Sequence, residues 1–156
     1  MDEGLTHLDE QGRAAMVDVS HKTATPRAAT AEAHVTMSAT LAGQLFAGDL
    51  PKGDALAVVR VAAIMGVKRT PELVPLCHPL PIEDVAVDVD RTDSGARITV
   101  TVRVTAKTGV EMEAMTGAAV GAVTLYDMVK GLDKAVTIGP IRLLSKTGGK
   151  SGAWQR

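Results

Sequence analysis

The fold is decided by two neighbouring stretches of sequence, VAVDVD at Val85–Asp90 and RITVTVRVT at Arg97–Thr105. Apolar and polar residues alternate in both, with a period of two, which is typical of a strand that buries one face. Between them lies Thr92–Ala96, and its Gly95 is suited to a tight turn. The sequence therefore predicts an antiparallel hairpin.

Weaker signals on both sides of this hairpin complete the fold. Helical spacing, N-terminal caps and glycine stops predict three helices. The expected elements in chain order are the strand Ala31–Ser38, the helix Thr40–Ala47, a helix from Asp54 to Ile64 or Gly66, the hairpin, a helix from Glu111 to about Leu132, and the strand Val136–Leu144, broken at Gly139-Pro140. This order favours an α+β fold: a ferredoxin-like antiparallel sheet with helices packed on one face.

Size and composition exclude several classes of protein. The 156 residues suit one domain, and a net charge of -1 with three aromatic side chains disfavours nucleic-acid binding. No stretch reaches the ~20 apolar residues of a membrane span, and the polar start of the chain is unlike a signal peptide. The single cysteine, Cys77, suits a reducing compartment. We expect a cytoplasmic protein with a mobile arm at 1–15, one domain at 16–152 and a tail at 153–156.

Subunit contacts are also expected. The helix that begins at Asp54 is apolar nearly all round, which indicates burial on more than one side. It is too short to cross a membrane, so a subunit interface is the better interpretation. A core of small aliphatic residues buries little area per side chain, and this too favours burial between subunits.

The helix that begins near Glu111 carries one narrow polar seam on an otherwise apolar surface. This seam either lines a cleft or is a partly exposed edge with an ordinary i,i+3 pair. A stripe of small residues on the helix allows another backbone to come close. The seam contains Glu113, Thr116, Thr124 and Asp127 with Lys130 beside it, and the stripe contains Gly117, Ala118, Gly121 and Ala122.

The two carboxylates of this seam are far apart. Glu113 and Asp127 are fourteen positions apart in the sequence, which at the rise of an α-helix corresponds to about 21 Å. One small substrate cannot contact both in the same chain. If two such helices packed antiparallel about a two-fold axis, Glu113 of one chain would approach Asp127 of the other. The sequence therefore predicts a site shared between subunits.

The segment PLCHPL, Pro75–Leu80, places Cys77 and His78 in a loop braced by prolines. The other histidines show no ligand spacing toward His78, so a metal site is disfavoured. Adjacent residues of an extended loop point in opposite directions, which disfavours a Cys77 nucleophile with His78 as its base. Substrate hydrogen bonding by His78 and the loop backbone, or a purely structural histidine, remain as interpretations.

Basic residues gather in the last part of the chain, where six Lys or Arg from Lys130 onward face one acid, Asp133. Lysines beside glycine-rich backbone, as in LPKGD and KTGGKSG, are typical of phosphate sites. Gly149-Lys150-Ser151 is not a P-loop, because Leu144 stands where its first glycine is needed and no helix is expected to follow. For Lys150, a flexible basic tail is the alternative.

Several of these segments together resemble the MoaC family of molybdenum-cofactor biosynthesis, the cyclic pyranopterin monophosphate synthases. The resemblance spans about Leu5 to Gly152. Its motifs are MVDVS (16–20), KGDALAVVRVAAI (52–64), LVPLCHPL (73–80), KTGVEMEAMT (107–116), LYDMVK (125–130) and IGPIRLLSKTGGKSG (138–152). It implies a lyase that converts (8S)-3',8-cyclo-7,8-dihydroguanosine 5'-triphosphate into cyclic pyranopterin monophosphate and releases pyrophosphate.

The resemblance also implies site residues and an assembly. It implies a homohexamer, a trimer of dimers with active sites at the dimer interface, and no required cofactor, although Mg²⁺ can accompany the phosphates. No metal ligand is assigned. The implied catalytic residues are Asp127, Lys52 and Lys130; the implied substrate contacts are Leu76, Cys77, His78, Glu111, Met112 and Glu113; and the implied phosphate contacts are Lys22, Arg27, Lys68 and Lys146.

Two alternative functions are weighed against this interpretation. A non-catalytic nucleotide-sensing or scaffold module would use the same basic loops without needing Asp127. A different phosphate-releasing cyclase would act on another nucleotide, such as GTP itself. Pyrophosphate release from the cyclic nucleotide separates the synthase from the non-catalytic module, and tolerance for GTP itself as a substrate tests the second alternative.

Overall fold

The structure is a computed structural model that describes residues 7–156. Four helices and five strands lie within these residues, and the predicted α+β class is confirmed. Their order is β1 (Thr25–Thr36), α1 (Ala39–Ala47), α2 (Ala55–Lys68), α3 (Thr70–Leu73), β2 (Asp84–Thr92), β3 (Gly95–Ala106), α4 (Glu111–Val129), β4 (Thr137–Thr147) and β5 (Trp154–Gln155). No helix in this part of the chain is long and apolar enough to span a bilayer.

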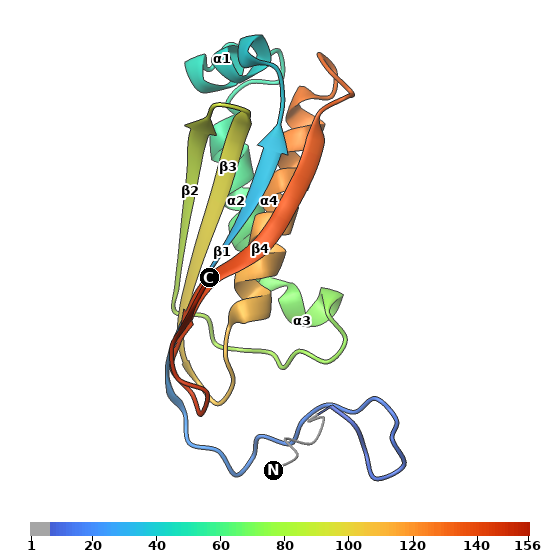
Figure 1. The fold of residues 1–156 in the computed structure, drawn as a ribbon, viewed down its shortest axis with the longest axis vertical. Coiled ribbons are helices and arrows are strands. Elements are labelled where there is room, and N and C mark those ends of the chain that lie inside the picture. The colour runs from blue at the N-terminus through green and yellow to red at the C-terminus, as the bar shows by residue number, and fades with distance from the viewer. Residues whose placement is uncertain (1–6) are drawn as a thin grey trace.

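The sheet has the ferredoxin-like strand order that the sequence predicts. Its strands are arranged β2-β3-β1-β4-β5, and every neighbouring pair is antiparallel. The connection from β1 to β2 contains α1, α2 and α3, and that from β3 to β4 contains α4; each passes over one intervening strand. Figure 1 shows α2 and α4 side by side behind the sheet, so the two long helices cover the same face.

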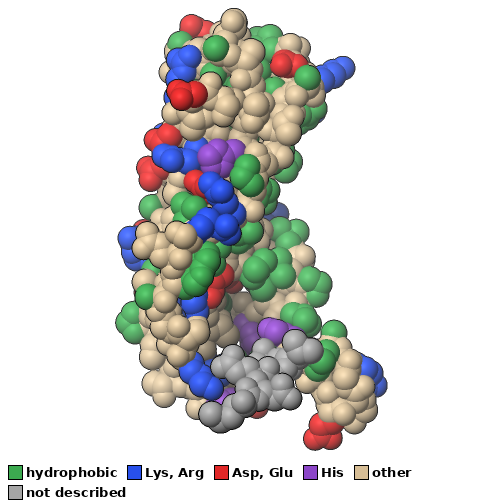
Figure 2. Space-filling model, viewed as in Figure 1, with side chains coloured by type: hydrophobic (Ala, Val, Ile, Leu, Met, Phe, Trp, Pro, Cys, Tyr) green, Lys and Arg blue, Asp and Glu red, His purple; other side chains and the backbone are tan. Residues whose placement is uncertain are grey.

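Period-two alternation separates a core face of the sheet from a polar face. On β3, the side chains from Ile98 to Val104 at even positions are fully buried under the helices, and the intervening residues are polar. The polar face carries Glu32, which is buried although it is charged. Its Oε1 accepts a hydrogen bond from Nε of Arg142 at 2.7 Å, and the charge is thereby compensated. Figure 2 shows basic, acidic and histidine side chains gathered on this side.

The hairpin forms as expected, with a turn at residues 93–94. Gly95 has a φ of +142°, and a Cβ there would collide with the carbonyl oxygen of Val35. The helix caps are also confirmed. Asp54 accepts a hydrogen bond from the backbone N–H of Ala57, and Gly48 ends α1 in a left-handed conformation.

The predicted end of the second helix is wrong. Helix α2 continues to Lys68 instead of ending at Ile64 or Gly66. Gly66 lies where α2 packs against α4, and an added Cβ would come within 2.9 Å of the Val120 side chain. The glycine is therefore needed for close packing rather than for helix termination.

The predicted small-residue stripe of α4 is confirmed as the place of close approach. A Cβ on Gly117 would lie 2.6 Å from Cγ2 of Val67 and 3.1 Å from the carbonyl oxygen of Ala63. A Cβ on Gly121 would lie 3.3 Å from the side chain of Ile98. Helix α4 is thus pressed against both α2 and the sheet.

Two strands differ from their predicted bounds. Strand β1 begins at Thr25, six residues earlier than expected, because Thr25 and its followers pair with the far end of β3. Strand β4 is not broken at Gly139-Pro140 but continues to Thr147. The register between β1 and β4 shifts between Ala33 and Val35, and this bulge takes the proline, which has no N–H to donate, out of the ladder.

The ends of the chain contain more local structure than the sequence indicates. The short strand β5 lies within the predicted tail at 153–156 and pairs with Ser145 and Lys146 of β4. Of the predicted arm at 1–15, residues 1–6 lie outside the described part of the chain. In the remainder, Leu8 and Ala14 form a bridge.

Replacing Gly117 with alanine is expected to lower the free energy of unfolding by about 1–3 kcal/mol, because the added methyl group overpacks the contact with Val67. Gly43→Ala in α1 is the matched control, since a Cβ there meets nothing within 4 Å. It should raise the free energy of unfolding by about 0.5–1 kcal/mol. Urea unfolding at one protein concentration measures both, and a stabilised Gly117→Ala variant would contradict the packing argument.

Candidate active site

A cavity of about 940 Å³ opens at the N-terminal end of α4. Its walls come from the segment before β1, the proline-rich loop after α3, the start of α4 and the loop between β4 and β5. Figure 2 shows the molecule hollowed at this lower end, with histidine side chains visible in the hollow. The charged and polar side chains that line it include Lys22, Thr25, Arg27, Cys77, His78, Lys107, Thr108, Glu111, Glu113, Lys146, Lys150 and Ser151.

Positive charge dominates this lining. Five of the side chains are Lys or Arg, whereas two are carboxylates, although the whole chain is close to neutral. A concave surface of one sign raises the local concentration of ligands of the opposite sign. The cavity is therefore suited to a small molecule with several negative charges.

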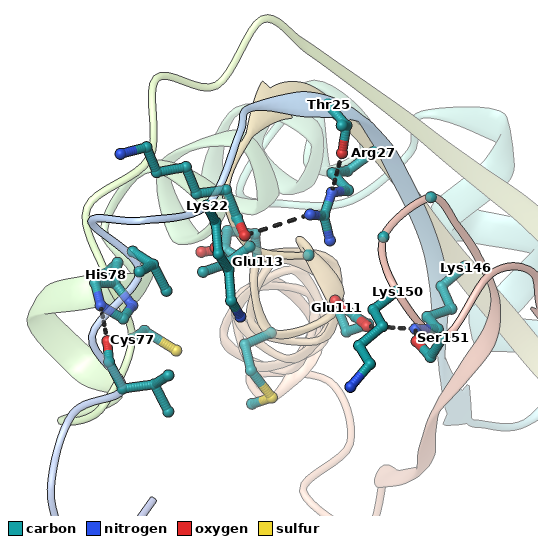
Figure 3. Close-up of a pocket in the computed structure, with 18 of the residues that line it drawn as sticks. Lys22, Thr25, Arg27, Cys77, His78, Glu111, Glu113, Lys146, Lys150 and Ser151 are labelled. Carbon is teal, nitrogen blue, oxygen red and sulfur yellow. Dashed lines mark hydrogen bonds and ion pairs between the residues drawn. The ribbon is translucent and has the colours of Figure 1, made fainter. Parts of the chain in front are cut away.

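Arg27 is held rigidly on one wall. Its Nε donates to Oγ1 of Thr25 at 2.9 Å, and its Nη2 donates to the carbonyl oxygen of Lys107 at 3.3 Å. The backbone of Gly148 and Gly149 lies against it so closely that a Cβ on Gly149 would collide with the guanidinium group. A guanidinium has five N–H donors, so most of them remain available for a ligand (Figure 3).

Lys146 lies beside this clamp on the last long strand. Its Nζ contacts the hydroxyl of Ser151 and lies 3.7 Å from Oε1 of Glu111. Figure 3 shows these side chains together with Lys150 around the loop that joins β4 to β5. Lys150 thus lines the cavity and is part of its wall.

Glu113 is the buried carboxyl of the cavity, with 3% of its surface exposed. Burial raises the pKa of Glu113 to about 6, an effect that the nearby charge of Glu111 increases and a backbone hydrogen bond opposes. Cys77 faces the same region, and burial together with the charge of Glu113 raises the pKa of its thiol. Cys77 is therefore not an activated nucleophile.

His78 is tied to a different part of the chain. Its Nε2 lies 2.8 Å from the carbonyl oxygen of Val17, in the segment before β1. Cys77 and His78 both line the cavity. Within residues 7–156, no three His, Cys, Asp or Glu side chains cluster as metal ligands.

A second polar cluster lies at the other end of α4. Asp127 accepts from Lys130 at 2.7 Å through Oδ1 and from Lys52 at 3.1 Å through Oδ2. Lys52 also donates to the backbone oxygen of Asp127 at 2.6 Å, because α2 and α4 are antiparallel and Lys52 precedes α2. The hydrogen bonds from Lys130 and Lys52, and then their charges, lower the pKa of Asp127. The same pairing raises the pKa of Lys130.

The predicted site residues thus form two groups rather than one. None of Lys52, Asp127 and Lys130 lines the cavity, and neither do Thr116 and Thr124 of the polar seam. The seam is therefore not the wall of one continuous cleft within a single chain. Lys68, predicted at the phosphates, is exposed at the end of α2 and does not line the cavity either.

Comparison with known proteins assigns the chain to a family. The model of the MoaC family matches residues 16–149. The chain belongs to the MoaC family. Proteins named cyclic pyranopterin monophosphate synthase resemble it at 57% identity in Geobacter sulfurreducens and 53% in Corynebacterium efficiens. The first match covers 97% of this chain and 96% of the relative, and the second covers 96% and 97%.

The MoaC match also gives a context to the predicted contacts. Leu76, Met112, Lys22 and the other substrate and phosphate candidates line one cavity, apart from Lys68. Sequence reasoning missed Thr25 and Lys107, which fix Arg27, and the wall residues Val17 and Val19. Val17 and Val19 lie in the motif MVDVS, and Lys107 begins KTGVEMEAMT, so family motifs were the available signal.

Gly149→Ala in this MoaC protein is expected to weaken the binding of inorganic triphosphate about tenfold, because the methyl group displaces the Arg27 guanidinium and its charge-assisted contacts. Gly152→Ala is the matched control. Both glycines have positive φ, 79° and 66°, but a Cβ on Gly152 meets nothing within 4 Å. Isothermal titration calorimetry compares them, and equal affinities would show that the clamp does not position Arg27.

Glu113→Gln is expected to change how stability depends on pH. The folded-state pKa of about 6 lies above the ordinary value of 4.5. The contribution of Glu113 to the free energy of unfolding is therefore fully present below pH 4.5 and is lost as pH rises through 6. Glutamine does not titrate, so the variant does not lose stability at this position as pH rises. Relative to the native chain it should gain up to about 2 kcal/mol of unfolding free energy between pH 4.5 and 7.5.

Denaturant unfolding across this pH range measures the difference. The control is Glu10→Gln, which removes the same charge at an exposed position. A gain of equal size in both variants would mean that net charge, rather than the burial of Glu113, is responsible.

Proposed function

We propose that this chain is a cyclic pyranopterin monophosphate synthase, a lyase of molybdenum-cofactor (molybdopterin) biosynthesis. The substrate is (8S)-3',8-cyclo-7,8-dihydroguanosine 5'-triphosphate, and the products are cyclic pyranopterin monophosphate and pyrophosphate. The observation that carries this proposal is a strongly basic cavity with one buried carboxyl group. It occurs in a chain more than 50% identical to proteins that bear this name.

The cavity offers complementary groups to the two ends of such a substrate. Arg27, Lys146 and Lys150 lie around the loop that joins β4 to β5 and can neutralise a triphosphate. Glu113 can accept hydrogen bonds from the N–H groups of the purine-derived ring, since a carboxylate has two acceptor oxygens. Binding at N–H donors would also favour the ionised form of this buried carboxyl.

The phosphate step needs charge stabilisation rather than a buried base. A sugar hydroxyl forms a new bond to the α-phosphorus, the bond to the bridging oxygen of pyrophosphate breaks, and negative charge gathers on the leaving group. Lysine and arginine side chains fixed in advance stabilise that charge without reorganising. Arg27 meets this condition, because Thr25 and the Lys107 carbonyl already hold it.

Rebuilding the ring needs protons to move on and off nitrogen, and Asp127 with its two lysines supplies suitable groups. The paired lysines keep Asp127 ionised and able to accept a proton. Lys130 remains protonated beside it and is able to donate. All three side chains are about half exposed, with fractions of 44–54%, so a substrate can reach them.

These two groups become one site when a second chain completes it. The outer face of the helix pair exposes Val58, Val61, Met65 and Val123, each more than 40% accessible. Such an apolar face favours a protein contact. An antiparallel partner there would bring Asp127 of one chain toward Glu113 of the other. We propose a homohexamer, a trimer of dimers, with the site at the dimer interface.

We propose no resident cofactor, and Mg²⁺ enters only as a counter-ion of the nucleotide phosphates. The substrate is a nucleotide derivative and Cys77 is a free thiol, so we place the enzyme in the reducing cytoplasm.

Two inactive variants are expected to restore activity when mixed. Asp127→Asn removes the proton acceptor but leaves nucleotide binding measurable, and Glu113→Gln impairs the cavity half. In randomly mixed dimers, half of the dimers are mixed and each of these has one intact site, so about a quarter of native activity returns. Pyrophosphate release from the cyclic nucleotide, after joint refolding of the two variants, measures this.

The control mixes Asp127→Asn with Lys52→Met, two changes within one half-site, and should restore nothing. Sedimentation gives the mass of the assembly. Full activity of a monomer, or no recovery in the first mixture, would contradict the shared site. Absence of pyrophosphate release by the native chain would contradict the proposed function itself.

A further inference from the structure

The wall of the cavity that precedes β1 has no regular secondary structure. We call this segment, Met16–Lys22, the strap. Val17, Val19 and Lys22 of the strap line the cavity. Two internal hydrogen bonds shape it, from the Ser20 amide to Asp18 at 2.8 Å and from the Lys22 amide to the Val19 carbonyl at 3.0 Å. Neither bond attaches the strap to the body of the protein.

The attachment comes from two side chains of the body. His78 Nε2 lies 2.8 Å from the carbonyl oxygen of Val17, and Lys107 Nζ donates to the carbonyl oxygen of Ser20 at 2.9 Å. Within the described residues, no backbone hydrogen bond joins strap residues 16–20 to the sheet or the helices. The dashed line at His78 in Figure 3 marks the first of these tethers.

The chemistry of the first tether fixes the state of the imidazole. A backbone carbonyl oxygen can only accept a hydrogen bond, so Nε2 must carry the hydrogen. In a neutral ring the other nitrogen, Nδ1, then has a lone pair and can only accept. No hydrogen bond engages Nδ1 within residues 7–156, and His78 lies in the cavity wall. One nitrogen serves the strap and the other is free for a ligand.

We propose that His78 is a positioning residue that holds the strap closed over the cavity through Nε2–H and the Val17 carbonyl. The tether keeps the ammonium group of Lys22 at the cavity and leaves Nδ1 as an acceptor. Loss of the tether opens one wall and removes a positive charge from the anion site. This inference deepens the proposed function, but each of its tests is made without turnover.

The two amide replacements of His78 separate its nitrogens. In His78→Gln the side-chain amide N–H lies near the position of Nε2 and can still donate to Val17. In His78→Asn the amide lies near the position of Nδ1 and cannot reach. Hydrogen exchange of the peptide that covers residues 16–22, measured on the full chain without ligand, should be about fivefold faster in His78→Asn. In His78→Gln it should stay within about twofold of the native rate.

Binding of inorganic triphosphate is the second measurement. His78→Asn should weaken it about fivefold through the displacement of Lys22, whereas His78→Gln should leave it nearly unchanged. His34→Gln, on the polar face of the sheet, is the control and should alter neither measurement. Hydrogen exchange of the β3 peptide reports global unfolding. A change in the exchange rate of the strap counts only where it exceeds the change in the exchange rate of β3.

A measurement on the native chain remains if His78→Asn does not fold. The nitrogen-15 shifts of His78 should show a protonated Nε2 and, in the neutral ring, a bare Nδ1. The opposite tautomer overturns the proposal. So does a strap in His78→Asn that exchanges at the native rate, a strap in His78→Gln that exchanges as fast as in His78→Asn, or triphosphate binding that does not follow strap exchange.

Discussion

The length of a straight helix pressed against the sheet governs the rest of this molecule. Helix α4 has 19 residues, and the glycines on its buried side bring it within van der Waals contact of α2 and β3. Held in this way it cannot bend to bring its ends together. Glu113 and Asp127 therefore stay about 21 Å apart along its axis. A substrate that needs both carboxylates must therefore meet them on two chains, and this is the physical basis of the proposed shared site.

The environments at the two ends of α4 shift the pKa values of their carboxyl groups in opposite directions. Burial gives Glu113 a pKa of about 6, near the range in which cells work. Asp127 is exposed, and hydrogen bonds from Lys130 and Lys52 lower its pKa. Titratable groups whose environments separate their pKa values are suited to different chemical tasks. A substrate that contacts both groups would meet Glu113 at one end, where the N–H donors of the substrate influence ionisation. At the other end it would meet Asp127, which stays ionised.

The sequence predicted those parts of the structure that depend on local rules. Alternation specified the hairpin, Gly48 specified the end of α1, Asp54 specified the start of α2, and the i,i+3 spacing specified the Asp127–Lys130 pair. The prediction was wrong where contacts between residues distant in the sequence determine the bounds of an element. Gly66 has the character of a helix stop, yet it lies inside α2 because Val120 needs the space. The N-terminal part of β1 lacks a strand pattern and is ordered by its partner β3.

The same distinction explains which site residues could be foreseen. Residues with conspicuous chemistry, such as Lys146 and His78, could be proposed from their motifs. The contact of Lys52 with Asp127 spans 75 positions, and that of Arg27 with the Lys107 carbonyl spans 80, so neither has a local signal. Without the family motif, the sequence gives no reason to single out Val17, because its contact with His78 is made by a backbone oxygen.

Backbone carbonyl oxygens are in fact a common element of the cavity. Those of Val17, Ser20 and Lys107 each accept from a side chain of the lining, His78, Lys107 and Arg27 in turn. Each donor uses one or two N–H groups to bind the protein itself, and its other N–H groups or a lone pair remain available to a ligand. The cavity is thus preorganised by donors that the ligand also needs, and this lowers the entropy lost when a polyanion binds. A change to one of these donors should therefore disturb both the cavity wall and the ligand contact. For His78, only replacements that keep one nitrogen's hydrogen bond and remove the other's can distinguish the two effects.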